Sequence, residues 1–180
     1  MLISYKNINI ENGGGIMKIF VTADTHFNHE NIIKYCNRPF KNVKEMNEAI
    51  IKNWNDTVRE DDIVYHLGDF GFGTKEELQE IFDRLNGKKY LIMGNHDYRV
   101  GRNYYIDLGF IEVYKKKCII GNSVLTHKPC DVLDGYINLY GHIHNKPVDS
   151  KYDDDKHFCV CLDKHDFKLI DLEKVVKVKL

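Results

Sequence analysis

Apolar runs of five or six residues alternate with polar stretches along the first half of the chain. Residues 17–21, 63–67 and 88–93 are mainly apolar, with Lys18, His66, Lys88 and Lys89 as the polar exceptions, and they include β-branched and aromatic side chains that favour buried strands. Each run is followed by glycine or by a polar cluster, which commonly ends a strand. The pattern therefore predicts three buried strands in this half.

The stretches between these runs carry helix signals. Asn42 with Glu45, and Thr74 with Glu77, have the spacing of a capping box. Behind each cap, apolar residues recur at the three- and four-residue intervals of a buried helix face. The sequence thus predicts helices that begin after Asn42 and after Thr74. The alternation of strand and helix predicts a largely parallel sheet.

Beyond Phe110 the helical signals fade, and short apolar runs follow one another. The strand candidates there are residues 111–114, 118–120, 124–126, 137–140 and 158–162. They predict a second, mixed sheet that packs on the first. Residues 168–180 are predicted to form a final strand and a short helix.

The first sixteen residues stand apart from this pattern. They end in Asn12-Gly13-Gly14-Gly15, and these glycines interrupt any regular element. One hypothesis is that Met17 is the natural start and residues 1–16 are a dispensable leader. An amino-terminal edge strand is an equally open interpretation. Residues 17–180 are predicted to form a single domain.

Composition agrees with a small enzyme domain. The chain has 180 residues, of which 43% are hydrophobic, enough for one substantial core. The net charge of −1 gives no overall field that would attract nucleic acid or a membrane. We find no apolar run long enough for a signal peptide or a membrane span, so we expect a cytoplasmic protein. The five cysteines lack Cys-x-x-Cys spacing and are expected to be reduced thiols.

Polar clusters follow the predicted strands and contain mostly side chains that bind metals. They are Asp24-Thr25-His26, Gly68-Asp69, Gly94-Asn95-His96-Asp97, His127 and Gly141-His142-Ile143-His144. Two carboxylates, one amide oxygen and four imidazoles supply enough ligands for two divalent cations. Two adjacent cations can hold both the attacking and the leaving oxygen of a phosphoryl transfer.

In this order the clusters resemble those of the calcineurin-like metallophosphoesterases, from Met17 to about Asp163. Residues 24–35 also resemble a compact bacterial and phage subgroup. The resemblance implies an α/β fold, a four-layer αββα sandwich of two mixed β-sheets flanked by helices. It also implies a two-metal site at the strand ends.

The resemblance assigns the ligands residue by residue. Asp24, His26 and His144 are expected to hold one ion. Asn95, His127 and His142 are expected to hold the other, and Asp69 is expected to bridge both. Such a nitrogen and oxygen ligand set accepts manganese, iron, zinc, nickel or cobalt.

His96 is predicted to be catalytic rather than a ligand. It directly follows Asn95, so its side chain points elsewhere and can reach the leaving oxygen as a proton donor. Asp97 is predicted to hold the His96 ring in its favoured tautomer.

Three further residues are candidates for binding substrate. Arg38 is the first, because Pro39 stiffens its loop and a guanidinium can hold phosphate at two points. Arg99 and Arg102 are alternatives. Asn28 and His29 are expected to line the pocket, although a structural role for His29 is equally open.

The sequence therefore predicts a metal-dependent phosphoesterase that uses hydroxide to hydrolyse a phosphodiester or phosphomonoester, with a small nucleotide-like substrate favoured. The first alternative is a nuclease that acts on a nucleic-acid polymer. A basic groove with exposed aromatic side chains would favour it, but the balanced charge counts against it. The run Lys115-Lys116-Lys117 is interpreted as a solvated turn, because no aromatic stripe accompanies it in the sequence. The second alternative, a non-catalytic scaffold, should lack a ligand or His96, and this chain lacks neither.

Overall fold

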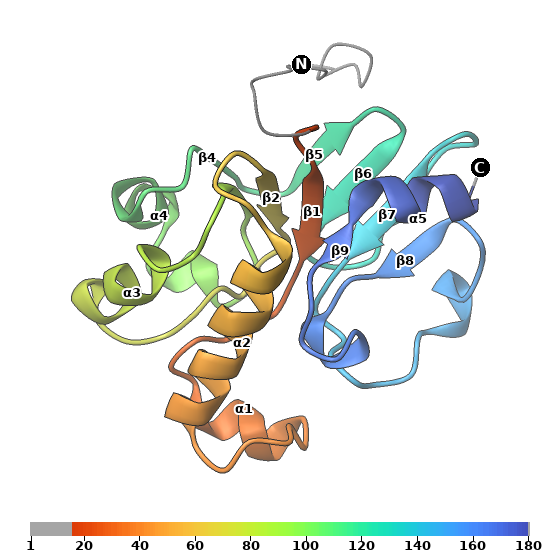
Figure 1. The fold of residues 1–180 in the computed structure, drawn as a ribbon. Coiled ribbons are helices and arrows are strands. Elements are labelled where there is room, and N and C mark those ends of the chain that lie inside the picture. Colours follow the sequence, from red (N-terminus) through yellow and green to blue (C-terminus); the bar gives the residue numbers. More distant parts are fainter. Residues whose placement is uncertain (1–15, 180) are drawn as a thin grey trace.

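The computed structural model describes residues 16–179 and contains two mixed β-sheets. The first sheet has the strand order β4-β3-β2-β1-β9 (Figure 1). Its strands are β1 (Ile19–Thr22), β2 (Ile63–His66), β3 (Lys88–Ile92), β4 (Glu112–Tyr114) and β9 (Ile170–Asp171). Strands β1 to β4 are parallel, and β9 pairs antiparallel with β1.

The second sheet has the order β5-β6-β7-β8. Its strands are β5 (Lys117–Ile120), β6 (Ser123–Thr126), β7 (Ile137–Tyr140) and β8 (His157–Cys159). The β5–β6 pair is antiparallel, whereas β6–β7 and β7–β8 are parallel. The predicted α/β fold of two mixed sheets flanked by helices is confirmed.

The two predicted capped helices are present as α2 (Val43–Thr57) and α3 (Lys75–Phe82). Thr74 and Glu77 form a complete capping box. Asn42 accepts a hydrogen bond from the Glu45 backbone N–H, but the Glu45 carboxylate accepts from the Lys41 N–H instead of closing the box. Helices α1 (Glu30–Tyr35) and α4 (Arg102–Leu108) were not predicted, and α5 (Leu172–Lys179) follows β9 as expected. Short 3-10 turns at Asp97–Arg99, Ser150–Tyr152 and Leu162–Lys164 complete the fold.

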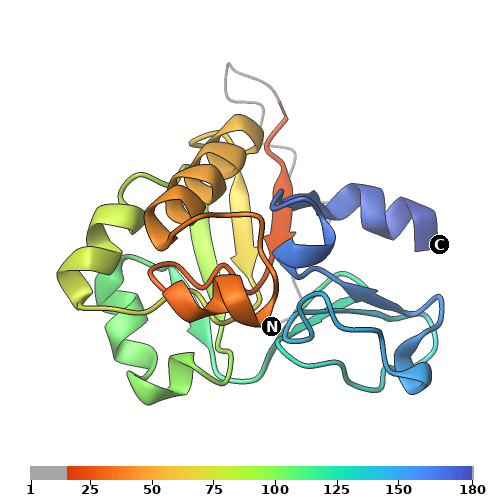
Figure 2. The same cartoon turned by 90° about the horizontal axis from the view of Figure 1, so that it is seen from below.

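The first sheet is buried on both faces, and its alternating side chains divide the core in two. In β1, Phe20 packs into the cluster that contains Trp54 of α2, whereas Val21 packs into the cluster that contains Leu125 and Leu139 of the second sheet. Helices α2 and α3 therefore cover one face, and the second sheet covers the other (Figure 2). Burial on both faces explains why β1 and β2 consist mostly of apolar residues.

One expectation is wrong, and another concerns residues that the structure does not describe. Residues 111–114 were assigned to the second sheet, but β4 pairs with β3 in the first, with Tyr90 opposite Glu112. The assignment was wrong because helix α4, which connects these parallel strands, was not predicted. Its sequence is short and is bounded by glycines at both ends. The leader or edge strand predicted for residues 1–16 falls on residues 1–15, which lie outside the described residues.

The topology brings several strand ends together. Because β1, β2 and β3 are parallel, the loops after them meet at one edge of the first sheet, and the loops after β6 and β7 meet them from the second. Backbone bonds join these loops, for example from Asp24 N to Gly68 O at 2.9 Å and from Gly141 N to His127 O at 2.9 Å. Within residues 16–179, no helix has the length and apolar character needed to cross a bilayer.

Candidate metal centre

Left-handed backbone is concentrated among the predicted ligands. Five of the seven have positive φ angles: Asp24 (61°), His26 (50°), Asp69 (59°), His142 (73°) and His144 (51°). This conformation is uncommon for residues other than glycine and persists only where the surroundings enforce it, which is frequent at functional sites. The loops are thus shaped to direct these side chains into one place.

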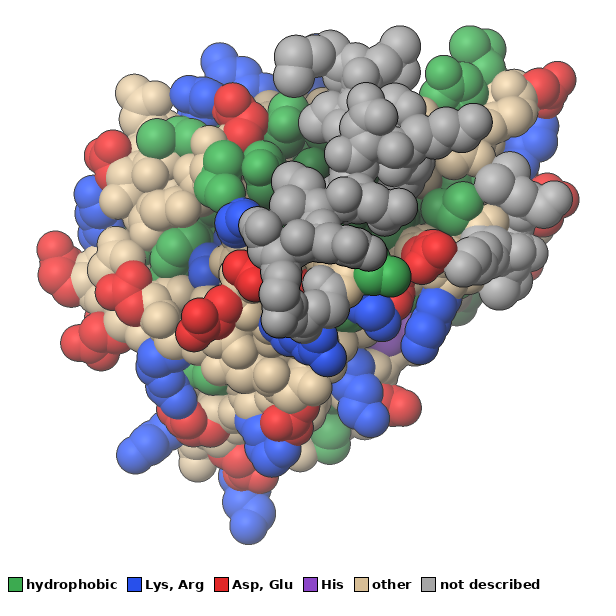
Figure 3. Space-filling view, turned by 45° about the horizontal axis from the view of Figure 1, so that its top comes forward, with side chains coloured by type: hydrophobic (Ala, Val, Ile, Leu, Met, Phe, Trp, Pro, Cys, Tyr) green, Lys and Arg blue, Asp and Glu red, His purple; other side chains and the backbone are tan. Residues whose placement is uncertain are grey.

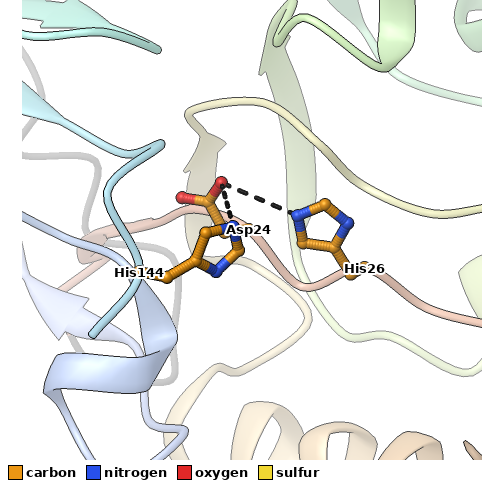
Figure 4. Close-up of side chains that lie close together, drawn as sticks. All are labelled: Asp24, His26 and His144. Atoms are coloured by element: carbon orange, nitrogen blue, oxygen red, sulfur yellow. Dashed lines mark ion pairs between the residues drawn. The ribbon is translucent and has the colours of Figure 1, made fainter. Parts of the chain in front are cut away.

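The first group consists of Asp24, His26 and His144. Asp24 Oδ1 lies 3.9 Å from His26 Nε2 and 3.7 Å from His144 Nε2, so one carboxylate oxygen faces both rings (Figure 4). Asp24 and His26 are buried, and Asp24 Oδ1 and His26 Nε2 have no hydrogen-bond partner among residues 16–179. Buried polar atoms without a partner are costly. A cation bound between them would satisfy both.

The second group consists of Asp69, His127 and His142, with Asn95 beside them. His127 Nδ1 lies 2.8 Å from the Leu67 carbonyl oxygen, to which it donates, so Nε2 presents its lone pair to the site in the neutral ring. That Nε2 lies 3.0 Å from Asn95 Oδ1 and 3.5 Å from Asp69 Oδ2. An imidazole lone pair and two oxygens therefore converge, which again fits a cation.

Asp69 lies between the two groups. Its Oδ2 atom is 3.7 Å from His26 Nε2 and 3.5 Å from His127 Nε2. Its Oδ1 accepts a hydrogen bond of 2.9 Å from the His96 backbone N–H. Burial, reinforced by the Asp97 and Asp24 carboxylates and opposed by His127, raises the pKa of Asp69 to about 6. Bound cations would favour the ionised form instead.

Glycine is required beside this carboxylate. A Cβ atom on Gly94 would lie 2.2 Å from Asp69 Oδ1, and one on Gly68 would lie 2.5 Å from Gly94 N. Both contacts are too close for any side chain. The Gly-Asp and Gly-Asn-His-Asp signatures therefore reflect the close approach of two loops around Asp69.

Arg38 was predicted to bind substrate, but the structure places it behind the first group. Its side chain is buried and pairs with Asp163, with Nε 2.8 Å from Oδ1 and Nη2 2.9 Å from Oδ2. It also donates to the backbone oxygens of Thr25 and Asp24, at 2.9 and 2.7 Å. These bonds occupy the guanidinium, so Arg38 positions the loop that carries Asp24 and His26.

Asp163, which sequence reasoning missed, joins Arg38 to a predicted ligand. Its Oδ2 lies 2.9 Å from His144 Nδ1, which directs His144 Nε2 toward Asp24. Burial is the largest single influence and lowers the pKa of His144, but the hydrogen bonds to Asp163 and Cys36 and the nearby Asp24 and Asp163 charges together raise it to about 10. No recognisable motif surrounds Asp163, so only the fold reveals this carboxylate-imidazole pair.

His96 lies beside the shared carboxylate without entering either group. Its Nε2 is 3.9 Å from Asp69 Oδ2, and its side chain is 39% exposed. The rings of His26, Phe72 and His29 surround it, at centroid distances of 5.5, 5.2 and 6.4 Å. His96 can therefore contact a molecule that enters from solvent, whereas Asp24, His26 and Asp69 are buried.

The prediction that Asp97 holds the His96 ring is wrong, because the Asp97 carboxylate has other partners. The buried Asp97 carboxylate accepts hydrogen bonds from the backbone N–H groups of Asp69, Phe70 and Gly94 and from the Tyr105 hydroxyl. Burial raises the pKa of Asp97, and these donors oppose that shift. Asp97 thus fastens the loop after β2 to the loop after β3.

The other two predicted substrate contacts differ in their surroundings. The Asn28 side chain accepts a hydrogen bond of 2.6 Å from Asn47 Nδ2 of α2, which holds the loop before α1 in place. His29 lies nearer the first group, with its Nδ1 3.3 Å from His26 Nδ1 and its ring 4.2 Å from that of Phe72. Burial, followed by nearby His96, lowers the pKa of His29. His29 and Phe72 therefore form a wall beside His96.

Two further contacts support the ligands from behind. Asp24 Oδ2 accepts hydrogen bonds from the His142 backbone N–H at 2.7 Å and from Cys161 Sγ at 3.1 Å, which leaves Oδ1 free to face the imidazoles. Thr25 donates to the Phe70 carbonyl at 2.6 Å and contacts His66 Nε2 at 2.9 Å. Burial, and to a lesser extent His127, lowers the pKa of His66 to about 3, so this ring is neutral.

Comparisons with known proteins agree with this geometry. The calcineurin-like phosphoesterase family pattern matches residues 17–174. An uncharacterized protein of Methanocaldococcus jannaschii, MJ1445, is 44% identical over 138 residues, which are 73% of this chain and 72% of that protein. The gene 66 protein of Mycobacterium phage L5 is 38% identical over 80 residues, 42% of this chain and 38% of the phage protein.

A solved structure shares the fold. The crystal structure of AQ665 from Aquifex aeolicus, a protein of unknown function, superimposes with a TM-score of 0.73 at 27% identity, covering 90% of this chain and 99% of that one. Together with the family match across both sheets and the strand-end loops, these relatives show that the chain belongs to the calcineurin-like phosphoesterase family.

Proposed function

We propose that this protein is a phosphohydrolase that uses two divalent transition-metal ions to hydrolyse a phosphodiester or phosphomonoester. The observation that carries the proposal is the position of Asp69 Oδ2, which faces His26 in one group and His127 in the other. A shared carboxylate allows two cations to bind close together, because its charge offsets their repulsion.

The ligand assignment follows the two groups. Asp24, His26 and His144 would hold one ion, Asn95, His127 and His142 the other, and Asp69 both. When bound, the ions would polarise the phosphoryl oxygens and activate water as the nucleophile. The mixed nitrogen and oxygen donors suit manganese, iron, zinc, nickel or cobalt.

The protein's own groups prepare this site before any substrate arrives. Asp163 and the Leu67 carbonyl orient His144 and His127, so that each ring directs Nε2 inward. Asp97 holds the loop that carries Asp69 to the loop after β3. The ligands therefore need little rearrangement to bind metal, which lowers the cost of forming the site.

His96 is the proposed proton donor to the leaving oxygen. It is the partly exposed imidazole beside Asp69, so it can reach a substrate held at the two groups. A general acid of this kind contributes about 10²- to 10⁴-fold to the rate. His29 and Phe72 would flank the leaving group.

Small nucleotide-like phosphoesters are the favoured substrates, and the cytoplasm is the proposed location. All five cysteines are free thiols in the structure, which suits a reducing compartment. The test is a screen in which metal-free protein is reloaded with each candidate metal and assayed on monoesters, cyclic nucleotides, dinucleotides and short oligonucleotides. Turnover by wild type that disappears in Asp69→Asn supports the proposal, and no turnover with any metal contradicts it.

A further inference from the structure

A groove adjoins the second group of metal ligands, because His127 also lines it. It has a volume of about 660 Å³, within the range of small-molecule and cofactor sites. Asn95, Tyr98, Lys115, Lys116, Lys117 and Lys128 line it, and we call it the lysine groove. A second hollow of about 440 Å³ shares Met93, Tyr98 and Lys115 with it, so the depression continues past Tyr98.

The groove is strongly basic. Its four lysines are exposed, and no ion pair to any of their ammonium groups is formed within the described part of the chain. The carboxylate of Asp131, which also lines the groove, is paired with Lys151 outside the groove lining, at an Oδ1–Nζ distance of 2.8 Å. On the face shown in Figure 3, by contrast, acidic and basic side chains are interspersed. The chain as a whole has a net charge of −1, but positive charge is concentrated locally in the lysine groove.

An exposed aromatic ring lies among these lysines. Tyr98 is 52% exposed, and its hydroxyl donates a hydrogen bond to the Lys115 carbonyl oxygen, which holds the ring against the lysine turn. Base stacking on such a ring, combined with a basic groove, is the usual way in which proteins bind single-stranded nucleic acid. No aromatic stripe is visible in the sequence around residues 115–117, because Tyr98 comes from the loop after β3.

We propose that the lysine groove binds a single-stranded nucleic acid whose adjacent phosphate lies at the candidate metal centre. The proposal rests on the proposed function for the chemistry, and it extends the substrate class from small nucleotide-like phosphoesters to a single strand of nucleotides. His127 belongs to both the groove and the second ligand group, and Asn95 lines the groove beside it, so phosphates that neighbour the reacting one would meet the lysines. A single strand fits better than a duplex, because Tyr98 needs the free face of an unpaired base.

Binding is tested with metal-free full-length protein, so that no cleavage occurs. The probe is a fluorescein-labelled oligothymidylate of about ten nucleotides, followed by fluorescence anisotropy over a series of salt concentrations. Four phosphate contacts predict that log K falls with log[salt] with a slope of about −3. The triple variant Lys116→Gln/Lys117→Gln/Lys128→Gln should bind at least tenfold more weakly, with a slope reduced by about 2.

Matched variants separate the groove from overall charge. Lys41→Gln/Lys44→Gln/Lys52→Gln makes the same charge change at exposed positions before and within α2 and should change the affinity by less than about twofold. Tyr98→Leu should weaken binding roughly tenfold, whereas Tyr98→Phe, which keeps the ring, should not. Equal losses in the two triple variants, or unchanged binding in Tyr98→Leu, would overturn the proposal.

A second assay distinguishes this proposal from the proposed function. Metal-loaded wild type is given bis(p-nitrophenyl) phosphate, a small diester that carries no further phosphate. Hydrolysis of that diester without binding of the oligonucleotide overturns the groove proposal and leaves the proposed function standing. Binding of the oligonucleotide without hydrolysis of either substrate supports the groove and contradicts the proposed function.

Discussion

Arg38 and Asp163, 125 positions apart in the chain, form a buried two-point ion pair behind the candidate metal centre, with N–O distances of 2.8 and 2.9 Å. The same carboxylate contacts His144 Nδ1 at 2.9 Å. A residue near the carboxyl end of the chain thus connects the loop after β1 to a ligand from the loop after β7.

Replacing Asp163 by asparagine should weaken the first metal site. The His144 ring loses its charged partner, and such losses typically cost 10- to 100-fold in metal affinity. Titration of metal-free protein followed by calorimetry should show one weakened step and one unchanged step. Asp166→Asn, an exposed change nearby, is the control. A uniform loss at both steps would argue that Asp163 acts on overall folding rather than on His144.

The Tyr105 hydroxyl should stabilise the fold through Asp97. Tyr105→Phe removes a 2.7 Å hydrogen bond to a buried carboxylate, so the free energy of unfolding should fall by about 1.5–3 kcal/mol. Tyr104→Phe is a close control, because the buried Tyr104 hydroxyl has no hydrogen-bond partner in the part of the chain that the structure describes. Urea unfolding measures both variants. Equal losses in the two would show that the Asp97 contact is not the cause.

His96→Ala should retain metal but lose turnover. If His96 protonates the leaving oxygen, kcat should fall by roughly 10²- to 10⁴-fold on substrates with a poor leaving group. The loss should be much smaller for nitrophenyl esters, because nitrophenolate needs little protonation. Kinetics on one substrate of each kind, with metal content checked, test this role. An equal loss on both substrates, or a missing ion, would remove it.

Lys89 should make stability depend on pH in the alkaline range. Its side chain is buried, donates to the Leu85 and Gly87 carbonyls and lies over the Phe82 ring, and burial lowers its pKa to about 8. Between about pH 8 and the ordinary lysine value the unfolded chain binds more protons, so the native state gains stability as pH rises.

The reference for this effect is Lys89→Met, which cannot titrate. The free energy of unfolding of wild type relative to Lys89→Met should increase by roughly 1–3 kcal/mol from pH 7 to pH 10. Chemical denaturation at both pH values gives the comparison. A difference that stays constant or decreases would mean that the ammonium group is not destabilised by burial.

The sequence predicted much of the fold because its local signals agree with the tertiary structure. The run before Asp24 is apolar because β1 is buried on both faces, and the Thr74–Glu77 capping box starts α3 as expected. Helix α4 was missed because it is a short segment between Gly101 and Gly109. Without this helix, the residues of β4 were assigned to the second sheet instead of the first. Short elements depend on packing more than on propensity.

The metal ligands could be predicted from the sequence, whereas the residues that support them could not. Asp24 and His26 lie two positions apart after a strand, so the chain itself brings them together. The contact between Asp163 and His144 depends on how the turn after β8 packs in the folded structure. No local sequence pattern predicts it. Arg38 was assigned to substrate for the same reason, because its buried partner is invisible in the sequence.

The most direct test of the account is the number of metal ions that one chain binds. Metal-free protein reloaded with manganese or zinc and passed through a desalting column should contain two ions per chain by elemental analysis. Asp69→Asn should retain its fold but hold fewer ions, with activity reduced by at least ~10³-fold, because it loses the charge that both cations share. One ion or none in folded wild type, or two ions and normal turnover in Asp69→Asn, would contradict a dinuclear centre built around Asp69.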